Sequence, residues 1–268
     1  MQDLQSKRAL ITGGAQGIGL ALALRLSAEG VEILLVDIDH TALGAAADRI
    51  SSSGGLVRTY RADITDIDGI GALRDRVHTE AGSIDILVNN AGIVHGGAFL
   101  DVPVNSHMQT YNVNTLGLVA MTHAFLPDLI AGPEGHLVNV SSASGFIGLP
   151  FGSTYASSKW AVIGFSESIR LELDMMDNRH VGVTTVCPSY VSTGLFEGAK
   201  PPRATRFVTP EKLSRLTVDA IKNDRPFVLT PWIVKVTPVL KGILPRRLFD
   251  SVTNLLRAKQ SMQNWTGR

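Results

Sequence analysis

The chain has 268 residues, of which 44% are hydrophobic and 18% are charged, a composition typical of globular proteins and unlike that of disordered ones. Its formal net charge is only +1, so no overall positive field would attract nucleic acid, and nucleic acid is not an expected partner. The single cysteine, Cys187, excludes an internal disulfide and is expected to be a buried, inert thiol.

The chain begins with residues 1–6, which contain no apolar stretch of signal-peptide length. No window approaches the roughly 20 uninterrupted apolar residues of a membrane-spanning helix. We therefore expect a cytoplasmic protein without a transmembrane span.

Short apolar runs then alternate with longer segments of helical pattern. Strands are predicted at residues 9–11, 31–36, 56–60, 84–88, 136–140, 181–186 and 227–230, and helices at 17–29, 41–51, 67–81, 104–130, 154–176 and 210–223. Several strands are apolar throughout, as parallel strands covered on both faces are. The alternation predicts an α/β fold: a doubly wound, mainly parallel, seven-stranded Rossmann-type sheet with helices on both faces, in three layers.

A glycine-rich turn follows the first predicted strand, with Gly13, Gly17 and Gly19 ahead of an apolar helix. Free N–H groups and the helix dipole at such a helix N-terminus favour a pyrophosphate. The spacing differs from the usual G-x-G-x-x-G fingerprint, so a tight strand-to-helix turn of any α/β protein is the alternative.

Asp37 closes the second predicted strand. A carboxylate there can accept hydrogen bonds from an adenosine ribose and would repel a 2′-phosphate, and Gln16 in the turn supplies no cation to bind such a phosphate. NAD is therefore favoured over NADP, and a strand-end cap is the alternative role for Asp37.

The ends of the third and fourth predicted strands carry further polar residues. Asp63 is interpreted equally well as a partner of the adenine amino group or as part of a helix cap. Asn89, Asn90, Ala91 and Gly92 suit the crevice in which open α/β sheets bind ligands, although ordinary turn chemistry is the alternative.

Tyr155 and Lys159 stand four residues apart in a predicted helix, which places both side chains on one face. An adjacent ammonium favours the phenolate, so Lys159 is expected to lower the pKa of Tyr155. Ser142 lies thirteen residues before Tyr155. A tyrosine of this kind beside a nucleotide-binding turn suggests hydride chemistry.

Taken together, the motifs resemble those of the short-chain dehydrogenase/reductase family. Five of them match in order over residues 7–193: Thr12-Gly-x-x-x-Gly17-Ile-Gly19, Asn89-Asn-Ala-Gly92, Asn114 in Asn112-Val-Asn-Thr-Leu-Gly117, Ser141-Ser142 and Tyr155-x-x-x-Lys159. Each motif alone is weak, whereas their joint order and spacing are highly specific.

The resemblance implies a role for each catalytic position. Tyr155 would be the general acid/base, and Lys159 would lower its pKa and bind the nicotinamide ribose. Ser142 would hold the substrate oxygen, in preference to Ser141. Asn114 would position a water in a proton relay.

The resemblance also implies a nicotinamide dinucleotide as the cofactor, for which Asp37 favours NAD, and no metal is expected. The residues expected to contact the cofactor are Gly13, Gln16, Gly17, Ile18, Gly19, Asp37, Asp63, Ile64, Asn90, Ala91, Gly92, Tyr155, Lys159, Pro188, Val191 and Thr193. The family usually has Pro-Gly where this chain has Pro188-Ser189. Ser189 lacks the access of glycine to positive φ, which puts the course of the nicotinamide loop in question.

Mostly apolar residues are expected around the reacting carbon: His95, Phe146, Leu149, Phe151, Tyr190, Leu195 and Phe196. They predict a hydrophobic secondary alcohol or ketone, steroid-, retinoid- or lipid-like. The alternatives are a dehydrogenase of polar sugar alcohols or hydroxy acids, a Rossmann-type epimerase or dehydratase, and a dinucleotide-sensing regulatory protein without catalysis.

One catalytic domain is expected at residues 1–230, with a mobile substrate loop at residues 192–209. Residues 231–268 form a C-terminal extension with apolar positions at helical spacing among Arg and Lys. This extension is expected to pack on the domain or at a subunit interface, and a peripheral membrane contact is the alternative. The resemblance implies a homo-oligomer, either a tetramer or a dimer.

Overall fold

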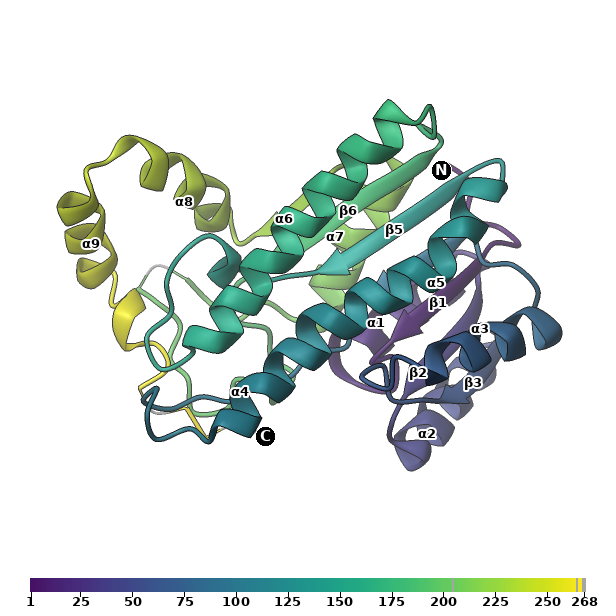
Figure 1. Cartoon of the computed structure of the whole chain (residues 1–268), viewed down its shortest axis with the longest axis horizontal. Helices are drawn as coiled ribbons and strands as arrows, with labels where there is room; N and C mark the ends of the chain where they lie inside the picture. The colour runs from purple at the N-terminus through teal and green to yellow at the C-terminus, as the bar shows by residue number, and fades with distance from the viewer. Residues whose placement is uncertain (204, 264, 267–268) are drawn as a thin grey trace.

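A single parallel sheet organises the computed structural model, which describes residues 1–203, 205–263 and 265–266 (Figure 1). Its seven strands are β1 (Arg8–Thr12), β2 (Glu32–Asp37), β3 (Val57–Arg61), β4 (Ile86–Asn89), β5 (Gly135–Val140), β6 (Val181–Pro188) and β7 (Phe227–Thr230). They are hydrogen-bonded in the order β3-β2-β1-β4-β5-β6-β7, all parallel. The predicted fold class is confirmed, and each strand lies within two residues of its expected bounds.

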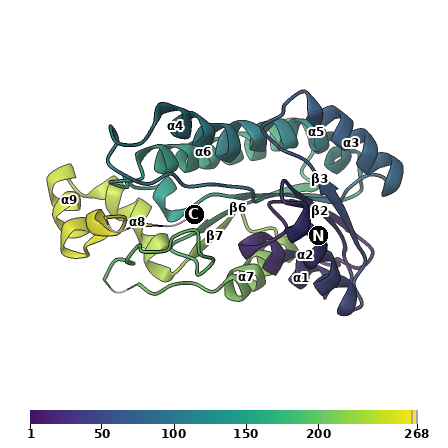
Figure 2. The same ribbon diagram turned by 90° about the horizontal axis from the view of Figure 1, so that it is seen from below.

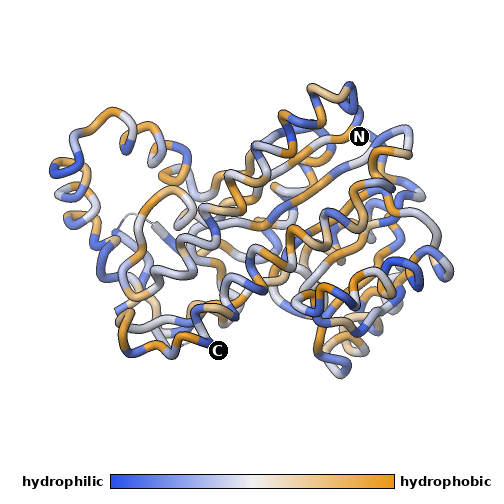
Figure 3. The backbone as a smooth tube through the Cα atoms, viewed as in Figure 1, coloured by the Kyte–Doolittle hydropathy of each residue, from blue (hydrophilic) through white to orange (hydrophobic). Residues whose placement is uncertain are grey.

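Helices cover both faces of the sheet (Figure 2). One layer holds α3 (Gly69–Glu80), α4 (Val104–Tyr111), α5 (Leu118–Ala131) and α6 (Ser153–Met175), and the other holds α1 (Gly17–Ser27), α2 (His40–Ser52) and α7 (Pro210–Lys222). The central strands are largely hydrophobic, as Figure 3 shows. They are buried between one apolar cluster that includes Leu22, Leu26 and Ile221 and a second that includes Phe125 and Leu129.

The helix expected at residues 104–130 is interrupted. A π-helical segment, η1 (Asn112–Gly117), separates α4 from α5. The whole run Val104–Ala131 is long and apolar enough to cross a membrane by length and composition. Polar residues such as Asn112, Asn114 and His123 interrupt this run, so it does not contradict the expectation that no uninterrupted apolar stretch of about 20 residues exists. The helix is 44% buried over its most apolar window, and α5 packs against β4 and β5, as a core helix of the sheet does.

The C-terminal extension leaves the body of the protein and returns to it (Figure 1). Helix α8 (Trp232–Ile243) buries only Val234, and α9 (Arg246–Leu255) buries no residue. The chain then passes through η3 (Ala258–Gln260) to Ser261 and Met262, each only 2% exposed. The end of the extension thus packs on the catalytic domain, whereas contact of α8 and α9 with another subunit or a membrane stays a prediction.

Candidate active site

The glycine-rich turn lies between β1 and the start of α1, at the carboxyl edge of the sheet. Gly13 and Gly17 adopt left-handed φ values of +60° and +58°. A side-chain carbon on Gly13 would lie 2.8 Å from the Cα of Ala91, so the turn packs directly on the chain that follows β4. Gln16 precedes α1 without a side-chain cap, which leaves the first N–H groups of the helix available to an anion.

Asn90 and Thr12 hold the turn in place. The side-chain amide of Asn90 donates to the carbonyl oxygens of Thr12 and Gly13, at 3.0 and 2.9 Å. The hydroxyl of Thr12 accepts from the backbone N–H groups of Asn90 and Ala91. Asn90 was predicted as a cofactor contact, and the structure shows in addition that it braces the turn. The bracing role of Thr12 was not predicted.

Asp37 ends β2 beside this turn. Its carboxylate accepts from the backbone N–H of Ala15 at 3.2 Å and from that of Asp39 at 3.2 Å. Asp63 accepts from both the N–H and the hydroxyl of Thr65, each at 2.8 Å. Because α3 begins only at Gly69, Asp63 stabilises a turn and does not cap a helix.

A groove of about 450 Å³ runs along this edge of the sheet. Most of the predicted cofactor residues line it, namely Gly13, Gln16, Gly17, Ile18, Asp37, Asp63, Ile64, Asn90, Ala91, Gly92 and Thr193. The lining also includes Ile38, Asp39, Ile93, Gln109, Val113 and Leu195, which sequence reasoning did not name as cofactor contacts. Among the described lining residues, three are aspartates and none is Lys or Arg.

Some predicted cofactor residues lie elsewhere. Gly19 sits behind the turn, against the carbonyl of Gly13 and the amide of Asn90. Val191 is buried and pairs with Val208 in an isolated parallel bridge, and Pro188 is the last residue of β6. The structure therefore does not bring Gly19, Pro188 and Val191 to the groove surface.

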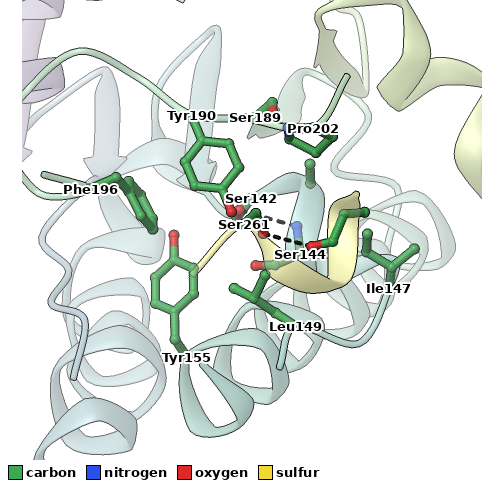
Figure 4. Close-up of a pocket in the computed structure, with 12 residues that line it drawn as sticks. Ser142, Ser144, Ile147, Leu149, Tyr155, Ser189, Tyr190, Phe196, Pro202 and Ser261 are labelled. Atoms are coloured by element: carbon green, nitrogen blue, oxygen red, sulfur yellow. Dashed lines mark hydrogen bonds between the residues drawn. The ribbon is translucent and has the colours of Figure 1, made fainter. Parts of the chain in front are cut away.

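Tyr155 and Ser142 meet at one end of the groove, in a small catalytic cavity (Figure 4). Tyr155 projects from the first turn of α6 and is 5% exposed. Its hydroxyl shares the cavity with Ser142, whose Oγ accepts from the N–H of Ser144 at 3.2 Å. A phenol and a serine hydroxyl thus converge on one point, where a small oxygen-bearing group could bind.

Burial raises the pKa of Tyr155, and the nearby Ser142 offsets this only in part. A lowering of this pKa by Lys159 stays a prediction, and in the protein alone it does not outweigh burial. Lys159 Nζ is 5.9 Å from the centre of the Tyr155 ring and donates to the carbonyl oxygen of Val140 at 2.9 Å. Burial of the phenol raises the pKa of Tyr155 by more than the positive charge of Lys159 could lower it at that distance.

Lys159 and Asn114 lie close to Gly92. Burial lowers the pKa of Lys159 to about 8. A side-chain carbon on Gly92 would lie 3.3 Å from both Lys159 Nζ and Asn114 Oδ1. The amide of Asn114, which is fully buried in the π-helical segment, bonds to the backbone N–H and carbonyl of Ile93 at 2.8 and 3.0 Å. The four predicted catalytic positions are thus brought to one end of the groove.

Aromatic side chains form part of the wall of the catalytic cavity. The rings of Tyr155 and Phe196 meet edge to face with their centres 5.6 Å apart, and Tyr190 and Phe196 do so at 5.2 Å. Of the residues expected around the reacting carbon, Leu149, Tyr190 and Phe196 line this cavity. Leu195 lines the groove instead, and His95, Phe146 and Phe151 line neither the groove nor this cavity.

The loop after β6 keeps an ordinary backbone at Ser189, which is not among the described residues with positive φ. Its N–H donates to the carbonyl oxygen of Thr230 in β7 at 2.8 Å, and it lines the catalytic cavity. Replacement of glycine at this position therefore does not strain the loop. Cys187, two residues earlier in β6, is fully buried, and burial raises the pKa of its thiol to about 12, in agreement with an inert thiol.

The C-terminal tail, residues 256–263 and 265–266, contributes to the site. Packing of the extension on the domain was expected, but none of these residues was predicted at the site. The tail is held against the loop at residues 192–209 by backbone bonds from Arg203 N–H to Leu256 O and from Lys200 N–H to Ser261 O, at 2.8 and 2.9 Å. Ser261 and Ala258 line the catalytic cavity, and the Ser261 hydroxyl donates to the carbonyl oxygen of Ala258 at 2.7 Å. Only the burial of an otherwise polar segment could have indicated this, and burial is not visible in a sequence.

Comparisons with known proteins agree with this geometry. A family model described as short chain dehydrogenase matches residues 7–204. Epidermal retinol dehydrogenase 2 of Mus musculus is 34% identical over 262 residues, which cover 97% of this chain and 85% of that protein.

Among solved structures, a short-chain dehydrogenase/reductase from Burkholderia phymatum in complex with NAD has a TM-score of 0.82 at 26% identity, covering 90% of this chain and 95% of that one. A metagenomic short-chain oxidoreductase in complex with NADP has a TM-score of 0.72 at 28% identity, covering 84% and 95%.

Proposed function

The chain belongs to the short-chain dehydrogenase/reductase family, oxidoreductases that act on CH–OH groups, and from this premise we propose that it is an NAD-dependent dehydrogenase of a hydrophobic alcohol. The observation that carries the proposal is the convergence of Tyr155 and Ser142 on one small cavity with mostly apolar walls, at the end of the groove. A retinol dehydrogenase among the relatives supports an apolar alcohol as the substrate.

The groove suits a dinucleotide. The free N-terminus of α1 and the glycine turn would hold the pyrophosphate, and Asp37 would accept from the adenosine ribose. When it is bound, the nicotinamide supplies the hydride acceptor or donor. The remaining steps fall to residues of this chain.

Tyr155 is the proton carrier in this proposal. In carbonyl reduction its buried phenol donates a proton to the substrate oxygen, and in alcohol oxidation the phenolate accepts one. Ser142 Oγ already accepts from the N–H of Ser144, so its own proton is free to be donated to the substrate oxygen. Lys159, with its pKa lowered to about 8, can exchange a proton near neutral pH and so resupply Tyr155.

NAD rather than NADP is proposed because Asp37, Asp39 and Asp63 line the groove and no described lining residue is basic. Replacement of Asp37 by Ser should weaken NADH binding and strengthen NADPH binding, changing their ratio by about tenfold to hundredfold, the range of a charged hydrogen bond. Asp37→Asn is the matched control, because it removes the charge but keeps an acceptor for Ala15 N–H. It therefore separates loss of the charge from loss of the hydrogen bond that supports the glycine-rich turn. Fluorescence titration of both nucleotides measures the ratio, and a wild-type preference for NADPH would overturn the assignment.

The activity itself is tested by a screen of apolar secondary and primary alcohols, small polyols and hydroxy acids with NAD and NADP side by side. Turnover of apolar alcohols is expected. Strong turnover of polyols with none of apolar alcohols would contradict the proposed substrate class. The cytoplasmic location stays a prediction.

A further inference from the structure

Two cavities adjoin each other around the first turns of α6. The catalytic cavity, which holds Tyr155 and Ser142, has a volume of about 60 Å³. The second, here called the side chamber, has a volume of about 540 Å³ and contains neither of these residues. The difference matters because a 60 Å³ space holds only a few water molecules, whereas ligand sites for drug-sized molecules are typically about 300–1,000 Å³.

The side chamber is built between α6 and the C-terminal extension. Ala156, Ser157 and Trp160 of α6 form one side, and Phe249 and Thr253 of α9 form the other. Tyr155 precedes Ala156 directly, so neighbouring residues of one helix face the two cavities. The side chamber therefore begins one residue away from the catalytic tyrosine.

Trp160 gives the side chamber a fixed wall. Its indole N–H donates to the carbonyl oxygen of Ser144 at 2.6 Å. Lys241 of α8 lies over the same ring, with Nζ 3.7 Å from the ring centre, and donates to the carbonyl oxygen of Phe146 at 2.8 Å. These contacts join the extension to the body of the protein at the side chamber.

The side chamber is open to solvent, because Ser153, Ser157 and Trp160 of its lining are exposed. Asp250 and Lys259 also line it, with their charged atoms 3.9 Å apart and their side chains 52% and 43% exposed. These two are the only charged residues among the described lining residues. The rest of the wall is apolar or carries hydroxyl groups, so the interior suits an uncharged apolar molecule.

The side chamber adjoins the catalytic cavity. Ile147, Leu149 and Ala258 line both cavities, so these three side chains form the partition between them. Each is only partly buried, and two of them come from the loop before α6 while the third comes from η3. A molecule that passed between Leu149 and Ala258 would reach the Tyr155 hydroxyl from the side chamber.

We infer that the side chamber binds the apolar body of an elongated alcohol whose reacting carbon lies at or near one end of the molecule. The end enters the catalytic cavity through the partition of Ile147, Leu149 and Ala258, and the chain lies between α6 and α9. This inference rests on the proposed function and specifies its substrate class. A compact, rigid substrate of the same volume does not fit the small catalytic cavity.

The test is a homologous series of straight-chain alcohols, from butanol to dodecanol, oxidised with NAD by the full-length protein. The expected result is a rise in kcat/KM of about three- to fourfold for each methylene that enters the side chamber, followed by a plateau. Turnover that is equal along the series, or that falls with length, would overturn the inference while leaving the proposed function in place. No turnover of any alcohol with either nucleotide would overturn both.

Two substitutions locate the effect. Ala258→Phe narrows the partition and should lower the ratio of dodecanol to butanol kcat/KM by at least about tenfold. Thr253→Phe fills the side chamber from α9, away from the partition, and should move the plateau to shorter chains. Ala45→Phe, on the exposed face of α2, is the matched control and should leave the whole series unchanged.

If Ala258→Phe does not fold, Thr253→Phe alone tests whether the side chamber binds the apolar body of the substrate, because Thr253 lines only the side chamber. An unchanged plateau in Thr253→Phe, with the variant folded by circular dichroism, would place the apolar body elsewhere and contradict the inference.

Discussion

At the scale of single residues, burial controls the proton on Tyr155. The phenol is 5% exposed, and burial raises its pKa. Lys159 directs a hydrogen bond to Val140 O rather than to the phenol. The free protein therefore carries Tyr155 as a neutral acid, ready to protonate a carbonyl oxygen.

This protonation state predicts opposite pH dependences for the two reaction directions. Oxidation needs the phenolate, and because burial raises the pKa of Tyr155, the phenolate fraction grows only as the pH becomes alkaline. We expect kcat/KM for alcohol oxidation to rise from pH 7 towards pH 10, whereas kcat/KM for carbonyl reduction stays level and then falls. Profiles measured in both directions, in the same buffers, check the signs, and an oxidation rate that falls over this interval would contradict them.

The sequence predicted the local parts of the site well and the distant parts poorly. Gly13, Gly17, Asp37 and Asn90 were predictable because strand ends and turns place them at one edge of a parallel sheet. The sign of the pKa shift at Tyr155 was not, because it depends on water excluded by aromatic residues from a loop far along the chain. Ser261 was missed for the same reason.

At the scale of elements, the C-terminal tail and the substrate loop at residues 192–209 pack together beside the catalytic cavity. Trp265 donates its indole N–H to the carbonyl oxygen of Leu195 at 3.0 Å, and Thr266 N–H donates to Glu197 O at 2.9 Å. Trp265 also packs on Gly96, where a side-chain carbon would come within 2.6 Å of the indole. The tail thus ties the loop to the segment that follows β4. The mobility of the loop stays a prediction.

Removal of the Trp265 side chain should weaken the packing of the tail on the substrate loop. In Trp265→Ala we expect KM for an apolar alcohol to rise about tenfold, the equivalent of one lost hydrogen bond and its packing, and amide hydrogen exchange at residues 195–203 to accelerate. Trp232→Ala, whose indole is 65% exposed on α8, is the matched control and should change neither. Equal effects of the two substitutions would show that the tail does not hold the loop.

Most of the strands were predictable as elements, because short apolar runs that alternate with helical segments are typical of a parallel sheet buried on both faces, whereas β3 carries mainly polar, exposed residues. The division of the run Val104–Ala131 by η1 was not, since the sequence keeps its helical pattern through that segment. The π-helical segment carries Asn114, and such segments occur frequently at functional sites. The helical pattern of α9 was visible in the sequence, but its projection from the body was not.

At the scale of the whole molecule, the outer faces of α5 and α6 carry exposed apolar side chains. Val119 is 37% exposed, Leu171 51% and Met175 85%. Exposed apolar groups on two neighbouring long helices are typical of a subunit interface. They agree with the homo-oligomer implied by the family resemblance, which stays a prediction.

This prediction is tested by light scattering after size exclusion. The wild type should have the mass of a dimer or tetramer, and Leu171→Glu should shift it to a smaller species, because a buried charge without a partner disfavours the interface. Leu100→Glu, at a position 92% exposed in a loop, should keep the wild-type mass. A monomeric wild type at micromolar concentration would refute the oligomer.

The central claim for the molecule is that Tyr155 moves the substrate proton, and its most direct test is turnover by Tyr155→Phe together with NADH binding. The account predicts that kcat/KM falls by about a hundredfold to ten-thousandfold, the usual contribution of a general acid/base, while the Kd for NADH stays within about twofold. Tyr60→Phe in β3, which lines neither the groove nor the cavities, is the control. Turnover by Tyr155→Phe equal to that of the wild type, at unchanged NADH affinity, would contradict the account.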